Sequence, residues 1–310
     1  MRKKLVKPKL LVIVGPTGSG KSSLAAKLAK KFSGEIVSAD SRKIYRGMDI
    51  GTAKPRLVAK GKLLMAEGIP YHLIDIRNPN REYTVQHFKA DALKAIREII
   101  KRGKLPILAG GTGLYIKTIV DNLKIPKVKP DFVLRRELEN EFKERGIQPL
   151  IQELVKIDPG AAYIVDPKNP RRVIRALEIA LGEKKLFSGS RKSGKPLFQT
   201  LQIGLDCERQ KLKVKIERRS RKMVQGGLIQ EVERLVKKYG QNARAYDAIG
   251  YREMIDYLNG KISKGKFFEL FIKNTWQYAR RQMTWFKKDP RIYWVKSEKE
   301  AMKLAADFLL

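Results

Sequence analysis

The sequence has little that would suit a secreted or a membrane protein. It holds one cysteine, Cys207, in 310 residues, which excludes an internal disulfide framework and a zinc site built from cysteines. No apolar run approaches the roughly 18 residues that cross a bilayer. The basic N-terminus leads into an apolar run of a strand's length, Leu10–Val14, and not into a cleavage site. We therefore expect a soluble, cytoplasmic protein that has no signal peptide and no membrane partner.

Acidic residues are scarce as well. The chain has 32 Asp and Glu against 67 Lys and Arg, so its formal net charge is +35. Such an excess indicates a polyanionic partner, because each cation set against a phosphate releases a condensed counterion. A lysine-rich surface without a partner is the alternative on charge alone. Nucleic acid is favoured because basic clusters recur along the chain, at Lys124–Lys129, Arg171-Arg172, Lys184-Lys185, Arg191–Lys195, Arg218–Lys222 and Arg280-Arg281.

Strand-like runs and helical patterns alternate in the first 120 residues. A helix is expected from Val85 to Lys101, with Thr84 as its N-cap and Gly103 as its stop. Such alternation predicts an α/β fold with a doubly wound parallel sheet. The runs that predict its strands are Leu10–Val14, Glu35–Asp40, Tyr71–Ile76 and Leu105–Gly110.

The pattern changes at a joint rich in proline and lysine, Lys124–Pro130. From there to about residue 185 only helical periodicity appears, and the segment Phe187–Pro196 is interpreted as mobile. We therefore expect an α/β core over 1–124 and 199–310, interrupted by a helical insertion over 125–198. After the insertion the sequence predicts a strand in 198–207, helices over Arg209–Lys238, Asp247–Leu258 and Phe267–Lys287, a last strand at Ile292–Val295 and a terminal helix.

A glycine-rich segment, GPTGSGKS, lies between a predicted strand and a predicted helix. It fits the pattern G-x-x-x-x-G-K-[ST], in which backbone N–H groups and a helix N-terminus surround a diphosphate. A structural glycine turn is the alternative. Lys21 is expected to reach the outer phosphate, and the Ser22 hydroxyl to be a ligand of Mg²⁺. The residues predicted to bind the diphosphate are Gly15, Pro16, Thr17, Gly18, Ser19, Gly20, Lys21 and Ser22.

Two further segments are candidates for the same edge of the sheet. Asp40 closes a predicted strand, so it either works beside the diphosphate, as a proton acceptor or through Mg²⁺, or caps a helix. Thr112 follows two glycines after the fourth strand, and either faces a ligand or caps a helix. Both alternatives stay open from the residues alone. The segment Tyr45–Pro55 is compatible with a surface loop.

Together these strings resemble the tRNA dimethylallyltransferases, also called tRNA isopentenyltransferases. The resemblance covers nearly the full length, in the family's order. It rests on GPTGSGKS (15–22), SADSRKIYRGMDIGTAKP (38–55), HLID (72–75), GGTGLY (110–115), PRRVIRALE (170–178), IGYREM (249–254) and RRQMTWF (280–286).

The resemblance implies a fold and a reaction. The expected fold is a P-loop nucleotide-kinase-like core with a helical insertion that grips the tRNA anticodon stem-loop. The expected reaction transfers a dimethylallyl group from dimethylallyl diphosphate to N6 of adenosine 37, in tRNAs that read codons beginning with U. The products would be N6-isopentenyladenosine and diphosphate, with Mg²⁺ as the cofactor. The family suggests a monomer.

The resemblance also implies roles for single residues. Asp40 matches the base that acts on the N6 amine, Thr112 a residue near the reacting adenine, and Arg219 an arginine placed on the diphosphate; these three form the expected catalytic set. Arg135 corresponds to an arginine at the start of the insertion, where the alignment can shift by two residues. The positions matched to tRNA contacts are Asp40, Ser41, Arg42, Lys43, Thr112, Arg135, Arg171, Arg172, Val173, Ile174, Arg175, Asp247, Gly250, Tyr251, Arg252, Arg280, Arg281, Gln282 and Trp285.

The sequence departs from the family pattern at a few positions. Lys43 stands where many members have Gln, near the expected adenine site, and Arg171 replaces a frequent Gln. His72 and His87 are interpreted as structural, and Cys207 as a buried strand residue. The three tryptophans fit core packing better than base stacking.

Two other functions compete with prenyl transfer. A P-loop small-molecule kinase using ATP would explain residues 15–22, but neither the charge nor the later strings. A non-catalytic RNA-binding regulator would explain the charge, but would leave the matches at Asp40 and Thr112 without a role.

Overall fold

The chain folds into two compact units. The computed structural model describes residues 7–61, 63–125, 131–183, 186–188 and 193–310. Unit 1 comprises Met1–Val120 with Pro196–Leu310, and unit 2 comprises Asp121–Lys195. The division falls at 120/121 and 195/196, where the sequence suggested 124/125 and 198/199. Parts of the expected joint, of the 187–196 segment and of the basic clusters between 124 and 195 lie outside the described residues.

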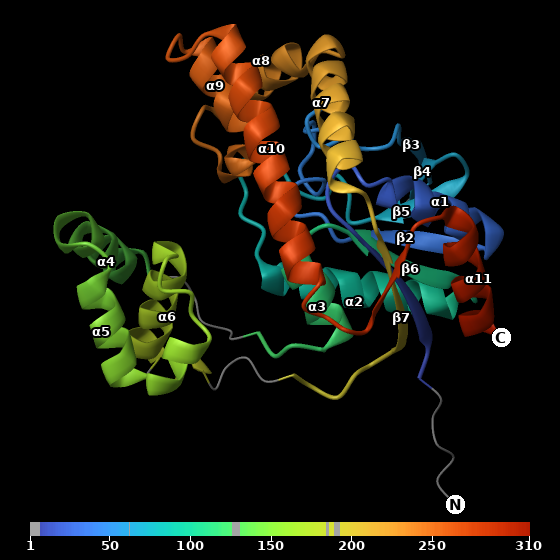
Figure 1. The fold of residues 1–310 in the computed structure, drawn as a ribbon, viewed down its shortest axis with the longest axis horizontal. Helices are drawn as coiled ribbons and strands as arrows, with labels where there is room; N and C mark the ends of the chain where they lie inside the picture. Colours follow the sequence, from blue (N-terminus) through green and yellow to red (C-terminus); the bar gives the residue numbers. More distant parts are fainter. Residues whose placement is uncertain (1–6, 62, 126–130, 184–185, 189–192) are drawn as a thin grey trace, which may run out of the picture. The chain divides into compact units, whose positions relative to one another are not determined.

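Unit 1 is built on an eight-stranded sheet in the order β3-β4-β5-β2-β6-β1-β7-β8 (Figure 1). The strands from β5 to β8 in that order pair in parallel, which confirms the expected parallel core. Their bounds are β1 (Lys9–Val14), β2 (Gly34–Ser38), β5 (Ile69–His72), β6 (Leu105–Gly110), β7 (Gln199–Leu205) and β8 (Ile292–Val295).

One edge of the sheet differs from the expectation. The strands β3 (Val58–Lys60) and β4 (Leu63–Ala66) pair antiparallel with each other, and β4 pairs antiparallel with β5. They were not predicted because they are short, and β3 is exposed along its whole length. Without a buried face, an edge strand leaves no apolar alternation in the sequence.

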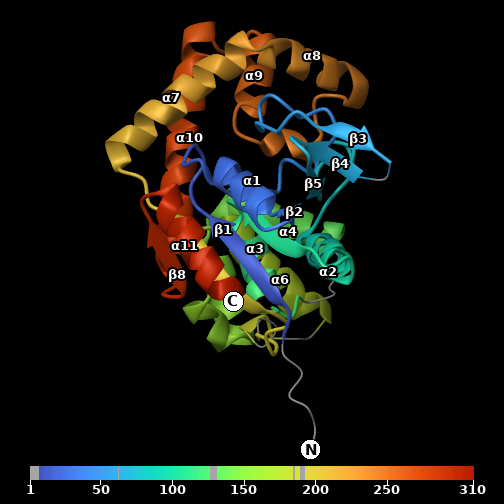
Figure 2. The same cartoon turned by 90° about the vertical axis from the view of Figure 1, so that its right-hand side faces the viewer.

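Helices cover both faces of the sheet. The helices α1 (Lys21–Lys31) and α11 (Glu298–Leu309) pack on one face, against alternate residues of β1 such as Leu11 and Ile13. The other face is covered by α2 (Val85–Lys101) and α3 (Gly113–Val120), against Leu10 and Val12. Both sides of β1 are therefore buried, as its continuous apolar run predicts. Figure 2 shows α1 and α11 on the viewer's side of β1.

The start of α2 confirms the sequence prediction in detail. The Thr84 side chain accepts a hydrogen bond from the His87 N–H, and the Thr84 N–H donates to His87 Nδ1. This reciprocal capping box satisfies two backbone N–H donors that the start of the helix would otherwise leave without a partner. It gives His87 the structural role that was expected, and His72 has one too, 2.7 Å from the buried carboxylate of Glu35.

The C-terminal part of unit 1 is helical, and Figure 1 shows these helices beyond the carboxyl ends of the parallel strands. The predicted single helix over Arg209–Lys238 is wrong. The chain breaks at Gly226 and Gly227, where φ of Gly227 is +99°, a left-handed conformation that favours glycine. The helices are α7 (Arg209–Gln225), α8 (Leu228–Tyr239), α9 (Tyr251–Leu258), which follows a 3₁₀ turn at Arg244–Asp247, and α10 (Lys264–Phe286).

Cys207 is half-buried and lies beyond the end of β7. The interpretation as a buried strand residue is therefore wrong, because β7 ends at Leu205. Within the described ranges, no helix is both long enough and apolar enough to cross a bilayer.

Unit 2 is a small helical body with its own core. It contains α4 (Phe132–Arg145), α5 (Gln148–Ile157), a 3₁₀ turn at Pro159–Tyr163, and α6 (Pro170–Glu183). The buried carboxylate of Glu178 pairs with Arg135 and Arg175, at 2.7 and 2.8 Å. The core residues include Val173 and Ile174, which are 0% and 5% exposed.

Candidate active site

The glycine-rich segment 15–22 joins β1 to α1, as its sequence predicts. Gly20 is the N-cap residue of α1 with φ of +98°, and no side chain caps the helix. The first amides of α1 have no partner within the helix, so they are available to an anion together with the positive end of the helix dipole. The Ser19 Oγ is also buried without a partner. These features fit a diphosphate and argue against a merely structural turn.

Lys21 is held inside this loop. Its Nζ lies 3.1 Å from the Pro16 carbonyl oxygen. Burial lowers the pKa of Lys21 to about 7, against the opposing effect of Asp40, and the nearby Lys43 and Arg219 lower it further. An anionic ligand would raise the pKa of Lys21 again, because a nearby negative charge stabilises the protonated ammonium.

Two more cations surround the same place. Arg219, on α7, donates from Nη1 to the Thr17 hydroxyl at 2.8 Å. Burial lowers the pKa values of Arg219 and Lys43, and in both cases Asp40 opposes the shift. Three cations therefore share one carboxylate, an excess of positive charge that a diphosphate would balance.

Asp40 lies two residues beyond β2. Its Oδ1 accepts hydrogen bonds from the N–H groups of Arg42 (2.9 Å) and Lys43 (3.4 Å). Residues 41–44 form a turn and not a helix, so Asp40 caps a turn and the helix-cap alternative is wrong. The backbone bonds fix the carboxylate at the carboxyl edge of the sheet.

Thr112 does not use its side chain to cap α3. Its Oγ1 accepts from the Ser41 N–H at 3.1 Å and donates to the Ser41 hydroxyl at 3.5 Å. The same side chain interacts with the phenol of Tyr278, on α10. Burial raises the pKa of Tyr278 to about 12, with Asp40 adding to the shift, so this phenol keeps its proton. Thr112 thus connects the segment after β2 to α10.

Two cavities meet at Asp40. The first, the phosphate cavity, has a volume of 300 Å³ and is lined by the glycine loop, Lys21, Ser22, Ser38 and Lys43. The second, the base cavity, has a volume of 260 Å³ and is lined by residues that include Met223, Phe271, Thr275, Tyr278 and Arg281. Four residues line both cavities and form their common wall: Thr17, Asp40, Thr52 and Arg219.

Gln282 joins the two glycine-rich loops. Its Oε1 accepts from the Thr17 N–H, and its Nε2 donates to the Gly111 carbonyl oxygen, each at 2.8 Å. Gln282 is only 6% exposed, and both ends of its amide bind the protein itself. Trp285, one turn further along α10, packs against the backbone of Gly113 and remains 37% exposed.

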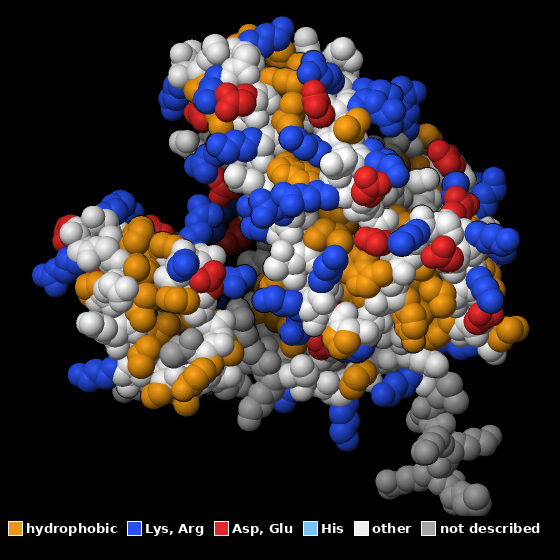
Figure 3. All heavy atoms as spheres, in the orientation of Figure 1, with side chains coloured by type: hydrophobic (Ala, Val, Ile, Leu, Met, Phe, Trp, Pro, Cys, Tyr) orange, Lys and Arg blue, Asp and Glu red, His pale blue; other side chains and the backbone are white. Residues whose placement is uncertain are grey.

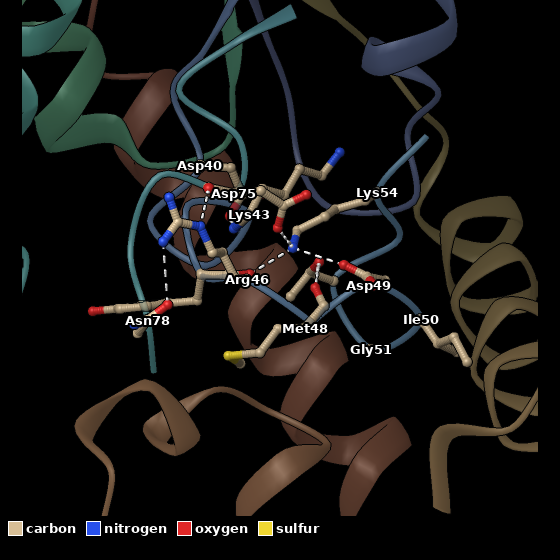
Figure 4. A network of polar contacts seen from close by, with 12 residues as sticks. Asp40, Lys43, Arg46, Met48, Asp49, Ile50, Gly51, Lys54, Asp75 and Asn78 are labelled. Carbon is tan, nitrogen blue, oxygen red and sulfur yellow. Dashed lines mark hydrogen bonds and ion pairs between the residues drawn. The ribbon is translucent and has the colours of Figure 1, made fainter. Parts of the chain in front are cut away.

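The segment 45–55 is not a simple surface loop. Figure 4 shows Lys54 at the centre of a polar network. The Lys54 ammonium bonds to Asp49 (2.8 Å), Asp75 (2.5 Å) and the Tyr45 carbonyl oxygen (2.5 Å), and its side chain is 2% exposed. The segment supplies Gly51 and Thr52 to the base cavity, so the alternative of a simple surface loop is wrong.

Other predicted tRNA contacts divide by exposure. Three have buried side chains in this structure: Val173 and Ile174 in the core of unit 2, and Tyr251 in that of unit 1. Gly250 is also buried, at the start of α9. Arg135 and Arg175 are partly exposed and paired with Glu178. The exposed set is Arg171, Arg172, Asp247, Arg252, Arg280, Arg281 and Trp285. Figure 3 shows Lys and Arg side chains spread over the visible face of each unit.

The site suits a metal ion that is bound largely through its ligand. No group of three His, Cys, Asp or Glu that could hold a metal occurs among the described residues. Ser22, Ser38 and Asp40 do supply oxygen donors to the phosphate cavity. Mg²⁺ takes few protein ligands when a diphosphate and water complete its octahedron, so this donor set fits Mg²⁺ bound with a diphosphate.

Tyr278 and Glu231, which contacts the 49–51 backbone, are not among the residues that the sequence singled out, and Lys54 lies in the quoted string 38–55 without a role assigned to it. A signal existed for Tyr278, because it lies four residues before Gln282 and therefore on the same side of α10. Glu231 and the buried position of Lys54 gave no signal, since their roles depend on contacts between distant segments.

The comparisons with known proteins agree with the motifs. Family models described as IPP transferase and Isopentenyl transferase match residues 43–289 and 8–60. The chain is 43% identical to the tRNA dimethylallyltransferase of Carboxydothermus hydrogenoformans over 298 residues, 95% of this chain and 94% of that one. It is 43% identical to the tRNA dimethylallyltransferase of Acetivibrio thermocellus over 293 residues, 93% of this chain and 92% of that one.

Solved structures extend the likeness to the fold. The full-length tRNA isopentenylpyrophosphate transferase from Bacillus halodurans matches with a TM-score of 0.70 and 38% identity, over 98% of this chain and 96% of that one. A eukaryotic dimethylallyltransferase acting on tRNA matches with a TM-score of 0.77 and 28% identity, over 97% of this chain and 79% of that one. The P-loop α/β fold and the family that the motifs indicated are thereby confirmed, and the kinase alternative is not favoured. The chain belongs to the IPP transferase family.

Proposed function

We propose that this chain transfers a dimethylallyl group from dimethylallyl diphosphate to N6 of adenosine 37 in tRNAs that read codons beginning with U. The products are N6-isopentenyladenosine and diphosphate. One observation carries the proposal: Asp40 stands in the wall between a cationic phosphate cavity and a second cavity whose mixed lining includes Phe271 and Tyr278. A carboxylate in that wall lies between a leaving diphosphate and an incoming base.

The phosphate cavity would stabilise the leaving group. When the bond from carbon to oxygen breaks, negative charge grows on the diphosphate. Lys21, Arg219 and the first amides of α1 offer cationic and N–H donors to that charge, and they are fixed before the reaction begins. Mg²⁺, held by Ser22 and the diphosphate, would neutralise further charge on the leaving group.

The base cavity would take the adenine. Its N6 amine is a poor nucleophile, so a carboxylate that accepts a proton as attack proceeds assists the reaction. Asp40 is oriented for this by the N–H groups of Arg42 and Lys43. Tyr278 lines the base cavity, and its protonated phenol would orient the base together with Thr112, which binds Ser41 next to Asp40.

A stacked loop base has to leave the stack before it can enter such a cavity. We propose that the exposed arginines hold the anticodon stem-loop meanwhile: Arg171 and Arg172 on α6, Arg252 on α9, and Arg280 and Arg281 on α10. Unit 2 would grip the stem, in a monomeric enzyme of the cytoplasm. Ser41, Arg42 and Lys43 follow Asp40 and would lie against the nucleotides around the target.

The test is incubation with dimethylallyl diphosphate, Mg²⁺ and an unmodified tRNA with adenosines at 36–38, followed by nucleoside mass spectrometry. We expect a gain of one C5 unit on adenosine 37. Asp40→Asn should lower the transfer rate by roughly 10²–10⁴-fold, the range for losing a general base. Asp256→Asn, which changes a half-exposed carboxylate on α9 that pairs with Lys261, is the matched control and should retain the wild-type rate. ATP hydrolysis without any C5 gain would overturn the proposal.

A further inference from the structure

A buried carboxylate on α8 binds the backbone of the 49–51 segment. Glu231 is 2% exposed. Its Oε2 accepts hydrogen bonds from the N–H groups of Asp49 (2.9 Å) and Ile50 (2.7 Å). Its Oε1 accepts from the N–H of Gly51 (3.1 Å) and from the hydroxyl of Tyr251 (2.6 Å). Four donors thus occupy the four lone-pair directions that a carboxylate offers.

This carboxylate is stabilised by dipoles and not by a cation. The ion pairs within the described ranges include none with Glu231. Three successive N–H groups that point to one place form an anion-binding concavity, and here the anion belongs to the protein. Because a carboxylate buried without a partner is strongly disfavoured, the segment and Glu231 each require the other.

Tyr251 also restricts the shape of the segment. A Cβ atom at Gly51 would lie 2.5 Å from Cε2 of the Tyr251 ring, so only glycine fits there. The ring is completely buried, and its hydroxyl donates to the same carboxylate. Glu231 and Tyr251 therefore fix both the hydrogen bonds and the steric boundary of residues 49–51.

Residues 51–53, held by these contacts, line the two cavities of the candidate active site. Gly51 and Thr52 line the base cavity, and Thr52 with Ala53 lines the phosphate cavity. At the other side of the segment Lys54 binds Asp49 and Asp75, as Figure 4 shows. The segment beside this wall is therefore held at two places. The Glu231 carboxylate binds its N–H groups, and the Lys54 ammonium binds oxygen atoms of Asp49, Asp75 and Tyr45.

We propose that Glu231 is a positioning residue for prenyl transfer, because its carboxylate sets the form of the 49–52 segment, which lines both cavities beside Asp40. It acts together with Tyr251 and does not itself touch a substrate. The inference rests on the proposed function and adds a residue that lies outside every recognised motif of the chain.

Replacing Glu231 by glutamine isolates this role. The amide has one acceptor oxygen, and its NH₂ group would face two of the four donors. The Tyr251 hydroxyl can rotate to accept from the NH₂ group, but a backbone N–H cannot, so the segment has to move. Displacements of about 1 Å in an active site lower rates by roughly 10²-fold.

The experiment compares Glu231→Gln and Tyr251→Phe with Glu233→Gln, which changes an exposed glutamate on the same helix. The measurements are kcat and KM for transfer to tRNA, and hydrogen exchange of the peptide that spans 48–54. For Glu231→Gln we expect kcat to fall roughly 10- to 100-fold, faster exchange at 49–51, and a tRNA dissociation constant within about threefold of wild type. The double variant should be no slower than Glu231→Gln alone, because both changes act on one carboxylate.

Two outcomes overturn the inference. One is a kcat for Glu231→Gln equal to that of Glu233→Gln at a temperature where both variants are folded. The other is unchanged exchange at 49–51, which would show that the segment does not depend on the carboxylate. A wild-type protein that transfers no prenyl group would be a different failure: it would overturn the proposed function, and with it the positioning role.

Discussion

Two segments of unit 1 present successive backbone N–H groups, and they differ in what those groups meet. The amides at the start of α1, in the 15–22 loop, have no partner within the helix and no capping side chain. The amides of 49–51 are all occupied by Glu231. Equivalent backbone chemistry therefore serves a ligand in one loop and the fold in the other.

The charges beside each loop explain the difference. The 15–22 loop, which we call the open loop, is accompanied by half-buried cations, and desolvation lowers the pKa of Lys21, Lys43 and Arg219. That is a destabilising arrangement until an anion arrives. The 49–51 segment, which we call the closed loop, already binds the carboxylate of Glu231, so it is stable without a ligand. Substitutions in the open loop should therefore alter ligand binding, and those in the closed loop should alter geometry and stability.

The largest effect that would sharpen this comparison is expected for Lys21→Met. It removes the cation of the open loop and keeps the length of the side chain. We expect transfer to fall at least about 10³-fold, because the leaving diphosphate loses its principal charged donor. Stability should be unchanged or higher, since a half-buried, partly desolvated cation without an ion-pair partner is replaced by an apolar group. Quenched transfer assays and thermal unfolding of the ligand-free protein measure the two quantities.

The control for this substitution is Lys27→Met on the same helix. Lys27 is exposed and forms a surface ion pair with Glu298, so its loss should leave transfer within about twofold and stability within about 1 kcal/mol. If Lys21→Met were as active as Lys27→Met, the 15–22 loop would not be the diphosphate site.

A second, smaller effect should appear in the pH dependence of ligand binding. Because burial lowers the pKa of Lys21 to about 7, this lysine is mostly neutral in the free protein at pH 8. A bound diphosphate favours the protonated form, so binding takes up a proton. The affinity for dimethylallyl diphosphate should then fall as pH rises above 7, by up to about tenfold per pH unit.

Calorimetry of dimethylallyl diphosphate binding without tRNA, at pH 8 in two buffers of different ionisation enthalpy, measures this uptake. The free energy of unfolding depends on pH in the opposite direction: it increases as the pH rises. The unfolded chain keeps the Lys21 proton up to a pKa of 10.5 and the free folded protein does not, so burial of this lysine destabilises the fold at low pH, and the penalty shrinks as the pH rises from about 7 to 10.5. Proton release on binding at pH 8 would contradict the assignment.

The comparison of the two loops also shows what the sequence could predict. The open loop was predictable in full, because its function depends on glycines and a lysine at fixed local spacing. The parallel strands were predictable because both sides of them are buried, and α2 because its cap and stop are local. Two features were not predictable: the hairpin of β3 and β4, and the break at Gly226 and Gly227. Each leaves only a weak pattern of apolar residues in the sequence.

The closed loop was beyond reach for a different reason. Its segment was compatible with a surface loop, because nothing in its composition reveals a glutamate 182 residues away. Gln282 shows the same limit: the resemblance marked its position, but only the fold reveals that it binds Thr17 and Gly111. Residues that contact a ligand follow local motifs, whereas residues that support them depend on long-range packing.

The smallest expected effect tests the closed loop itself. Ala53 is exposed at the end of the clamped segment and has φ of +50°, a left-handed conformation. For a residue with a Cβ atom this conformation costs about 1 kcal/mol, and glycine avoids most of that. The greater freedom of glycine in the unfolded chain offsets roughly half of the gain. Ala53→Gly should therefore stabilise the protein by about 0.5 kcal/mol, which denaturant unfolding can resolve when variants are measured side by side.

Ala59→Gly in the exposed strand β3 is the matched control, because it makes the same change where φ is not positive. Glycine within a strand lowers stability by roughly 0.5–1 kcal/mol, so the two substitutions should have opposite signs. A loss of stability as large as that of Ala59→Gly would mean that the clamp does not impose the left-handed conformation at residue 53. The distinction between a loop closed by its own carboxylate and a loop left open for a ligand would then have to rest on Glu231 alone.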